Sequence, residues 1–507
     1  MADTIADLLA PHADDAPALG APGRGWMSHG ALRAQCGAVR AALAAAGIDE
    51  ADRVAIVLPN GPEMAAVFLA VASACCAAPL NPAYKEDEVD FYLSDLRAKA
   101  IILAEGEDGP AASAAMKRGL RVVRLSVAEG AAAGAFALDL GGEGDAPAAG
   151  PEAVGLVLHT SGTTSRPKIV PLLQRNLAAS ARHIGEALAL GAGDRCLNMM
   201  PLFHIHGLVA ATLSSLAAGG SVWCAPGFDA LKVFSWFGEA EPSWYTAVPT
   251  MHQAILARAA RNTAAVEAMD LRLIRSSSAS LPPQVMTALS ETFGCPVVES
   301  YGMTEAAHQM TSNPLGKGRQ VPGSVGVAAG PEVMTADEAE NAILAPGRLG
   351  EVVISGPNVT PGYEANPEAN AKNFFEADGK RWFRTGDQGR FDEAGYLRIT
   401  GRLKEIINRG GEKVSPLEVD EVLMDHPAVA QAVTFAIPHA KLGEEVGAAV
   451  VLREGECADE AGVRAFVRER LAEFKTPRKV VILDEIPKGA TGKLQRIGLA
   501  EKLGLAS

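Results

Sequence analysis

Short apolar runs alternate with segments of helical periodicity along most of the chain. The runs Arg53–Leu58 (RVAIVL), Ala100–Ala104 and Val154–His159 predict buried strands, and Glu88–Arg97 predicts a helix before the second of them. Further strands are expected at Arg195–Met200, Ser221–Cys224, Leu271–Arg275 and Pro296–Glu299. Strands that alternate with helices in this way are typical of an α/β architecture.

The longest apolar run, Met64–Leu80 (MAAVFLAVASACCAAPL), falls short of the roughly 20 residues that cross a bilayer, and a proline lies next to its end. It therefore predicts a buried helix. The acidic start of the chain lacks the basic flank of a targeting peptide, and the final GLAS matches no sorting signal. We expect a soluble, cytoplasmic protein without a membrane partner.

The pattern changes near residue 400. Short strands are expected at Gly395–Thr400, Glu405–Asn408 and Ala430–Ile437, and helices at Pro416–Asp425 and Glu460–Glu473. A large multi-layer α/β body (1–400) followed by a small, mobile α+β domain (401–507) explains this change.

Composition narrows the function classes. The chain has 507 residues, of which 48% are hydrophobic, so it can bury a sizeable core. Its 46 basic and 60 acidic residues give a net charge of −14, which argues against a nucleic acid partner. Seven scattered cysteines without a CxxC pair favour a reducing compartment and no structural zinc. The oligomeric state, monomer or homodimer, stays open.

A polar segment, HTSGTTSRPK at 159–168, follows one of the predicted strands. It combines five hydroxyl side chains and a glycine with the cations Arg166 and Lys168. Backbone N–H groups and hydroxyls in such a loop can surround phosphate oxygens. A polar surface turn would have the same composition.

Three later segments carry similar alternatives. In ESYGMTE (299–305), Tyr301 could stack on a base while Thr304 and Glu305 meet a phosphate and its Mg²⁺, or the segment could be an ordinary turn. Asp387 in RTGD and Arg402 in GRLK could bind ribose hydroxyls or form a surface ion pair. A lysine such as Lys493 in PKGATGKLQR is usually solvated.

The order of these segments along the chain is more informative than any one of them alone. HTSGTTSRPK, MPLFHIHG, ESYGMTE, RTGD, GRLKEIINRGGEKVSP and PKGATGK occur in this order, and together they resemble the adenylate-forming superfamily of acyl-CoA synthetases, luciferases and peptide-synthetase adenylation domains. The resemblance covers essentially the whole chain. One departure is that Ser165 and Ile169 stand where the phosphate loop usually has glycines, which predicts a stiffer loop.

The resemblance implies ATP, Mg²⁺ and coenzyme A as cosubstrates and cofactor of an acid–CoA ligase. A carboxylate attacks the α-phosphorus of ATP, pyrophosphate leaves, and a thiol then displaces AMP. The implied catalytic residues are Lys493, Thr304, Glu305 and His204, with Glu305 facing the metal. The implied ATP-binding residues are Thr160, Ser161, Gly162, Thr163, Thr164, Lys168, Ala279, Ser280, Glu299, Ser300, Tyr301, Gly302, Met303, Thr304, Asp387, Arg402 and Lys493.

For the second step, relatives swing the small domain about a hinge that maps to Lys404. The swing withdraws Lys493 and brings Gly410 and Gly411 to the channel for the coenzyme A thiol, which His204 gates. Glycines there let the pantetheine arm pass close to the backbone.

The acid pocket maps to His206, Ser277, Ser278 and His308, which are polar where enzymes for fatty and aryl acids are usually apolar. Donors in a small cavity suit a second carboxylate and reject apolar acids. IRSSSASL and MTEAAHQMTSNP resemble the oxalate–CoA ligases most. Malonate–CoA ligases are the nearest alternative, followed by other short- and medium-chain acyl-CoA synthetases. Two remote alternatives are a luciferase-like oxygenase and a non-catalytic nucleotide-binding homologue.

Overall fold

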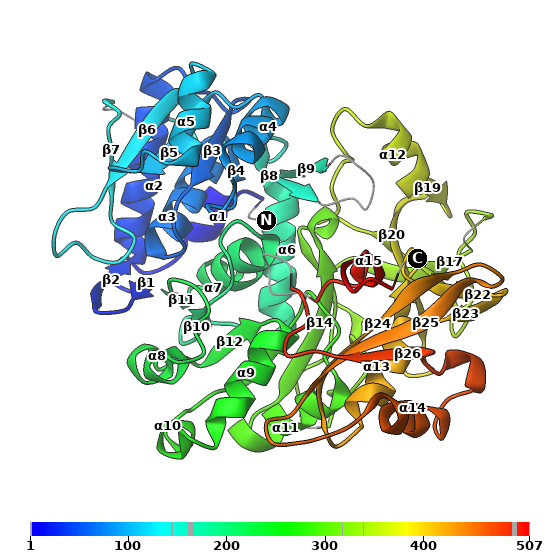
Figure 1. The fold of residues 1–507 in the computed structure, drawn as a ribbon. Helices are drawn as coiled ribbons and strands as arrows, with labels where there is room; N and C mark the ends of the chain where they lie inside the picture. Colours follow the sequence, from blue (N-terminus) through cyan, green and yellow to red (C-terminus); the bar gives the residue numbers. More distant parts are fainter. Residues whose placement is uncertain are drawn as a thin grey trace.

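A computed structural model describes residues 3–142, 146–160, 167–316, 318–337, 339–488 and 494–505. These residues form a large N-terminal α/β body and a small C-terminal domain, which confirms the predicted fold class (Figure 1). The described part contains no helix long and apolar enough to cross a membrane.

The first sheet of the body has mainly parallel strands. Its antiparallel pairs are β6 with β7 and β8 with β9. The strands in spatial order are β7 (Ala137–Leu138), β6 (Arg121–Ser126), β5 (Ala100–Ala104), β3 (Arg53–Val57), β4 (Cys76–Pro79), β8 (Val154–Thr160) and β9 (Lys168–Leu173). Helices α4 (Glu86–Leu96) and α5 (Pro110–Lys117) connect its strands. The predicted strands and helix in this part of the chain are confirmed within one or two residues.

A second sheet, also parallel in its centre, carries the later segments. Its strands in spatial order are β16 (Val327–Ala328), β15 (His308–Ser312), β14 (Val297–Met303), β13 (Leu273–Ser276), β12 (Trp244–Ala247), β10 (Arg195–Asn198), β11 (Ser221–Cys224), β1 (Pro17–Ala21) and β2 (Arg24–Ser28). The helices along it are α2 (His29–Ala45), α8 (Val233–Ala240), α9 (Pro249–Ala259), α10 (Thr263–Glu267) and α11 (Pro283–Phe293).

Two helices lie between these sheets. Helix α3 (Pro62–Ala72) contacts β1, β11 and β8, and α6 (Gln174–Ala187) contacts β8, β9 and β15. Every residue from Met64 to Ala72 is buried, which explains why this helix is apolar all round. The predicted helix over Met64–Leu80 is too long, because the chain turns at Ser73 and Cys76–Pro79 forms β4. The remaining short helices of this region are α1 (Ile5–Leu9), the π-helix η1 (His206–Leu213), α7 (Ser214–Ala217) and the 3-10 helix η2 (Thr304–Ala306).

A third, antiparallel sheet completes the body. It contains β17 (Glu332–Ala336), β18 (Gly350–Ser355), β20 (Lys380–Phe391) and β19 (Phe374–Ala377), with β21 (Leu397–Arg402) paired to β20 and α12 (Pro367–Asn373) beside it. Asp387 on β20 lies opposite Arg402 on β21. The first strand of the C-terminal domain begins five residues later, at Ile407.

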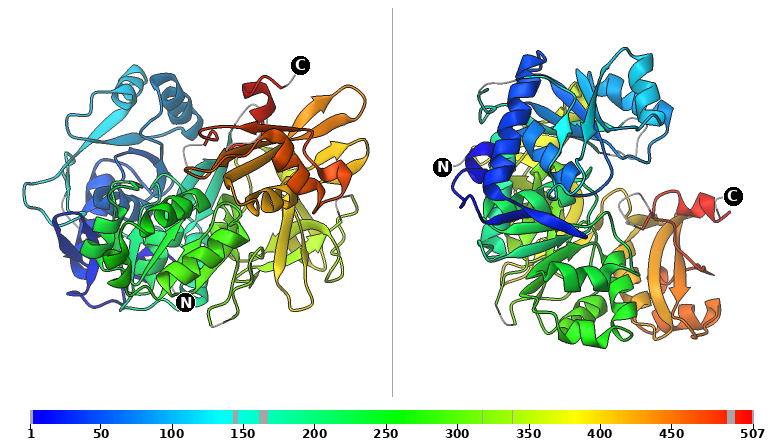
Figure 2. Two further views of the ribbon diagram at one scale, coloured as in Figure 1. Left: turned by 60° about the horizontal axis from the view of Figure 1, so that its bottom comes forward. Right: turned by 90° about the vertical axis from the view of Figure 1, so that its left-hand side faces the viewer.

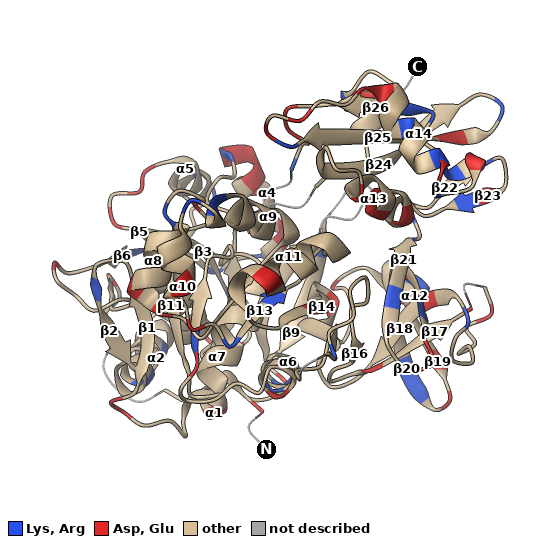
Figure 3. Ribbon diagram, turned by 90° about the horizontal axis from the view of Figure 1, so that it is seen from below, with Lys and Arg blue, Asp and Glu red and all other residues tan. Residues whose placement is uncertain are grey.

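The C-terminal domain has its own mixed sheet and its own core. The strands are β23 (Glu412–Val414), β22 (Ile407–Arg409), β25 (Gly443–Leu452), β24 (Val429–His439) and β26 (Lys479–Ile482); the helices are α13 (Pro416–Met424), α14 (Glu460–Arg468), η3 (Glu473–Lys475) and α15 (Leu499–Lys502). Two further views show this domain, orange to red, against one side of the body (Figure 2), and a view from below shows β21 leading toward it (Figure 3).

Strand direction locates the site. Polar segments that can bind or react lie at the carboxyl ends of five strands. In the order β8, β10, β12, β13 and β14, these are the hydroxyl-rich loop, the PLFHIHG turn, Thr246, the serine run and ESYGMTE. Ligands of open α/β sheets bind at the carboxyl ends of the parallel strands. The predicted site residues are therefore expected to meet where the carboxyl ends of β8 in the first sheet and of the other four strands in the second sheet come together.

Candidate active site

Glu305, Tyr363 and Lys168 form a cluster at the end of η2. The Tyr363 hydroxyl donates to Glu305 Oε1 at 2.9 Å, and Lys168 Nζ lies 4.2 Å from the centre of the Tyr363 ring. Burial raises the pKa of Glu305, while the Tyr363 hydrogen bond and the charge of Lys168 oppose the rise. Burial likewise lowers the pKa of Lys168, and Glu305 opposes that shift. A carboxylate after the end of β14 and a lysine at the start of β9 thus lie on the same tyrosine. Together they could bind a cation and a phosphate.

Thr160 and Lys168 lie opposite each other on β8 and β9, so they share one face of the sheet. Ile169 belongs to β9, where its side chain is buried. A β-branched residue suits this strand position, and no glycine is needed there. The predicted phosphate-loop residues Ser161, Gly162, Thr163 and Thr164, with Ser165, lie outside the described residues, as does Lys493.

Tyr301, Asp387 and Arg402 form a second cluster. The Tyr301 hydroxyl donates to Asp387 Oδ2 at 2.6 Å, and Arg402 Nε donates to Asp387 Oδ1 at 3.0 Å. Asp387 is buried, whereas about half of the Arg402 side chain is exposed. The charge of Asp387 raises the pKa of Arg402. The sequence alternatives for this pair, an ion pair and a ribose site, share this geometry, because a carboxylate beside a half-exposed arginine can also accept from vicinal hydroxyls.

Glu299 is a buried carboxyl behind this cluster. Its Oε1 accepts from the backbone N–H of Leu281 at 2.8 Å, and its buried Oε2 has no hydrogen-bond partner among the described residues. Burial raises the pKa of Glu299 to about 8. Ala279 and Ser280, on the loop that ends at Leu281, are exposed. An open loop beside an unsatisfied carboxyl oxygen can receive the edge of a nucleotide base.

Arg275 lies at the centre of the predicted acid pocket. It is fully buried, and its Nη atoms lie 3.4–3.5 Å from His206 Nε2, Thr246 Oγ1, His308 Nδ1 and Gln309 Oε1. Its Nε has no partner, and no carboxylate pairs with it in the described part of the chain. Burial lowers the pKa of Arg275 to about 9, so it is still a cation at neutral pH. A buried charge without a counter-ion is strongly unfavourable unless a ligand supplies one.

His206 connects Arg275 to Ser278. His206 Nε2 lies 2.6 Å from Thr246 Oγ1, and its Nδ1 lies 3.0 Å from Ser278 Oγ. Arg275 can only donate, so in the tautomer with the His206 proton on Nδ1, the Nε2 atom accepts from Arg275 or Thr246. In that tautomer Nδ1–H donates to Ser278 Oγ, and the Ser278 hydroxyl hydrogen is left for a ligand.

The backbone that carries these side chains is unusual. Ser278 has a φ of 73°, and Ala307 and His308 have φ values of 47° and 104°. Residues other than glycine rarely adopt such conformations, which concentrate at functional sites. Gly302 allows the approach, because a Cβ there would lie 1.8 Å from the His308 carbonyl oxygen. His308 and His206 face each other with ring centres 5.1 Å apart.

Other nominated residues are placed differently. The Ser277 hydroxyl donates to the carbonyl of Ser300 at 2.8 Å, so it joins β13 to β14 and does not face the acid pocket. The Ser300 hydroxyl in turn lies 3.0 Å from that of Ser312. Gly302 and Met303, at the end of β14, pair with Gln309 and His308 on β15, and Thr304 is buried at the start of η2.

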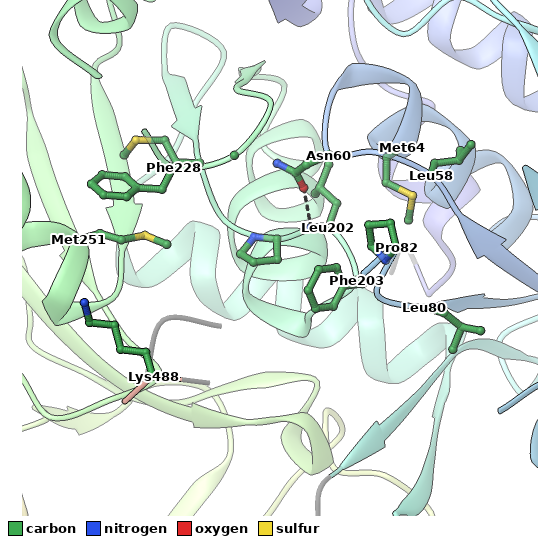
Figure 4. A pocket seen from close by; sticks show the side chains of 13 residues that line it. Leu58, Asn60, Met64, Leu80, Pro82, Leu202, Phe203, Phe228, Met251 and Lys488 are labelled. Carbon is green, nitrogen blue, oxygen red and sulfur yellow. Dashed lines mark hydrogen bonds between the residues drawn. The ribbon is translucent and has the colours of Figure 1, made fainter. Parts of the chain in front are cut away.

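A cavity of about 390 Å³ lies beside the PLFHIHG turn (Figure 4), and none of its lining residues belongs to the Arg275 cluster. Phe203, the neighbour of His204, lines it, and Lys488 of the C-terminal domain lies at its edge. The other lining residues are mostly apolar: Leu58, Asn60, Met64, Leu80, Pro82, Met199, Pro201, Leu202, Gly227, Phe228 and Met251. This lining suits a largely apolar ligand.

Gly410 and Gly411 are not near this cavity. Both have positive φ and form the turn between β22 and β23, which lies well away from β10 and β12 (Figure 1). Lys404, between β21 and β22, is close enough to Lys168 to lower its pKa. The segment beside Lys488 thus faces the body, and the glycine turn points away from it.

Four residues near the site were not nominated from the sequence: Arg275, Thr246, Gln309 and Tyr363. Arg275 offered one weak signal, a cation at the end of the run LRLIR, which also contains Arg272. Tyr363 offered none, because its contact with Glu305 joins residues 58 positions apart.

Known proteins resemble this chain in both sequence and structure. The family model for the AMP-binding enzyme matches residues 9–364, and that for the AMP-binding enzyme C-terminal domain matches 418–493. The oxalate–CoA ligase of Arabidopsis thaliana is 44% identical, over 97% of each chain, and that of Saccharomyces cerevisiae is 41% identical, over 90% of this chain and 88% of its own. The structure of ATP-bound MatB from Rhodopseudomonas palustris superposes with a TM-score of 0.87 at 32% identity over 99% of both chains.

Proposed function

This chain belongs to the AMP-binding enzyme family, and from that premise we propose that it is an ATP-dependent acid–CoA ligase that converts oxalate to oxalyl-CoA. The acid and ATP first give an acyl-adenylate and pyrophosphate. The thiol of coenzyme A then displaces AMP. Both sequence and geometry support this reaction, and the acid pocket supports the choice of substrate.

The observation that carries the proposal is the buried Arg275, which has no carboxylate partner among the described residues. A diacid would place its second carboxylate against this guanidinium, and so would neutralise the charge that the fold leaves unpaired. Ser278 and His308 add donors on either side. An apolar acid would leave all these groups unsatisfied, so the pocket discriminates against it.

Oxalate is favoured over malonate for two reasons. Oxalate–CoA ligases align with this chain at 41–44% identity over nearly its whole length. Oxalate also has adjacent carboxylates, so the group that meets Arg275 must lie within a few ångströms of the reacting one. The groups of the Arg275 cluster lie close to one another, with hydrogen-bond distances of 2.6–3.5 Å, and a compact cluster suits the shorter diacid. Malonate is the second candidate.

On the ATP side, we place Tyr301 against the adenine, with Glu299 and the loop of Ala279 and Ser280 at the edge of the base. Asp387 and Arg402 bind the ribose. Lys168, Thr160 and the hydroxyls of Ser161, Thr163 and Thr164 bind the β- and γ-phosphates with Gly162, and Thr304 binds the α-phosphate. Lys493 bridges the acid and the α-phosphate during adenylation, a role that suits a compact ammonium charge.

The residues present fit Mg²⁺. Glu305 is a buried carboxyl whose ionised form is supported by Tyr363 and Lys168. The described residues contain no group of three or more His, Cys, Asp or Glu side chains that could hold a metal alone. This arrangement matches Mg²⁺ held by one carboxylate and substrate phosphates, where it would neutralise charge on the phosphates.

For the thiol step we propose rotation of the C-terminal domain about Lys404, in the link between β21 and β22. Residues 1–400 and 401–507 would then move as units. Rotation replaces the segment near Lys488 and Lys493 with the turn at Gly410 and Gly411. The apolar cavity beside His204 receives the pantetheine arm, and the ring of His204 controls access to the adenylate.

The experiment measures ATP–pyrophosphate exchange without coenzyme A, and AMP release and thioester formation with it, by the purified full-length chain. The proposal expects oxalate-dependent exchange in the first assay, and oxalyl-CoA with stoichiometric AMP in the second. Exchange without any thioester would instead favour an adenylating enzyme with another acceptor.

A further inference from the structure

The turn 306–309, which carries His308, is held by side chains from outside the acid pocket. Ala307 and His308 both have left-handed backbone conformations, with φ values of 47° and 104°. Such conformations persist only where surrounding interactions stabilise them. The described contacts identify those interactions.

Asn358 contacts both ends of the turn. Its fully buried amide donates to the carbonyl oxygens of Ala306 at 2.8 Å and Gln309 at 2.9 Å. One amide group therefore fixes the distance between the residues on either side of the strained pair. If the turn relaxed, at least one of these carbonyls would lose its donor in a buried setting, which is unfavourable.

Ser180 contacts the middle of the same turn. This fully buried residue of α6 donates from its hydroxyl to the carbonyl of Ala307 at 2.6 Å. Helix α6 also fixes Asn358 indirectly, because Asn176 donates to the carbonyls of Pro357 at 2.7 Å and Val359 at 3.1 Å. Asn176 and Ser180 are four residues apart, so they lie on one face of the helix.

We propose that Asn358 and Ser180 are positioning residues for acid recognition: by holding the turn 306–309 in its left-handed conformation, they direct the His308 ring toward Arg275 and the acid. The hydrogen bonds of these two side chains go to backbone carbonyls, and none of those described joins them to Arg275, His206 or Ser278. This inference rests on the proposed function of the Arg275 cluster, and it adds two specificity determinants that the acid itself does not touch.

The test compares KM for the acid with KM for ATP, in AMP-release assays, for Ser180→Ala and Asn358→Asp. Loss of one neutral hydrogen bond in Ser180→Ala should raise KM for oxalate about threefold to tenfold and leave KM for ATP unchanged. Asn358→Asp should have a larger effect in the same direction, because an oxygen replaces the donor that faces two carbonyls. Ser180→Thr, which keeps the hydroxyl, should restore a value near that of the wild type.

Ser73→Ala is the matched control. Ser73 is buried and donates from its hydroxyl to the carbonyl of Ala70 at 2.8 Å, in a turn remote from the acid pocket. It should lower thermal stability to a similar extent without changing KM for the acid. The proposal is wrong if Ser180→Ala behaves like Ser73→Ala, or if KM for ATP and KM for the acid rise together.

Failure of the substrate assignment would look different. If the wild-type enzyme activates another small acid in place of oxalate, the same variants are measured with that acid, and the positioning role is judged by the same separation of KM values. If Asn358→Asp does not fold, Ser180→Ala and its threonine rescue decide the question.

Discussion

An Nη atom of Arg275 lies 3.4 Å from Nδ1 of His308, both side chains are buried, and no carboxylate of the described residues pairs with Arg275. The guanidinium donates, so His308 accepts on Nδ1 and carries its proton on Nε2 when neutral. Two donors, of which Arg275 is a cation at neutral pH, therefore meet where the described residues place no carboxylate against Arg275. This pair gives the acid pocket its preference for a second carboxylate.

Replacing Arg275 should separate activity from stability. Arg275→Met should lower kcat/KM for oxalate by about 100-fold or more, since the variant loses a charged contact to the substrate. The ligand-free variant should melt at a higher temperature than the wild type, because an unpaired buried cation has been removed. Steady-state kinetics and a calorimetric scan measure the two effects. A variant that is both inactive and less stable would indicate that Arg275 is structural.

Replacing the donors beside Arg275 should impair activation of the acid more than binding of ATP. His308→Ala and Ser278→Ala each remove a hydrogen bond to a charged group, so kcat/KM for oxalate should fall about 10- to 150-fold. KM for ATP should stay near the wild-type value. Ser277→Ala is the control within the same serine run, because the Ser277 hydroxyl is used by the Ser300 carbonyl. Equal losses in all three variants would argue against a specific pocket.

Tyr363 should set the acid limb of the pH profile. Burial raises the pKa of Glu305, and the hydrogen bond from Tyr363 opposes that rise. In Tyr363→Phe the opposing interaction is lost, so the pKa of Glu305 rises further and its carboxylate is protonated at a higher pH. As the pH is lowered, the adenylation rate should therefore begin to fall at a higher pH than in the wild type. A higher Mg²⁺ concentration should be needed for the same rate. An unchanged acid limb would contradict the assignment of Glu305.

Two variants of the C-terminal domain should separate the half-reactions. Lys493→Ala should nearly abolish adenylate formation and largely spare thioester formation from preformed acyl-adenylate, because the lysine has left the site by then. Gly411→Phe should show the opposite pattern, since a bulky side chain blocks only the thiol. Single-turnover assays of each step check both. Equal loss in both steps would contradict rotation about Lys404.

Much of the fold could be predicted because buried strands have distinctive sequences. Val154–His159 and Ala100–Ala104 are apolar runs that end at polar loops, and each forms a strand with a parallel partner in the same sheet. The prediction of a single helix over Met64–Leu80 was wrong for a physical reason. Both the helix α3 and the strand β4 within it are buried on all sides, so neither has a polar face that would mark the boundary between them.

The site was predictable only where motifs carry it. Tyr301 and Asp387 were named from ESYGMTE and RTGD, and the fold joins them by a hydrogen bond. Arg275 could not be ranked from the sequence, since an arginine at a strand end is usually solvated, and its burial depends on elements far along the chain. Ser277 and Ser278 look equivalent in a serine run. The left-handed backbone at Ser278 turns one hydroxyl toward His206, while the other faces Ser300.

The most direct test of the account is a comparison of acids at equal concentration. Oxalate, malonate, acetate and octanoate are each offered to the purified enzyme with ATP and coenzyme A, and AMP release is measured. The account predicts the highest kcat/KM for oxalate, with malonate second and the two monoacids far lower, because only a diacid neutralises Arg275. Faster release with octanoate or acetate than with oxalate would contradict it.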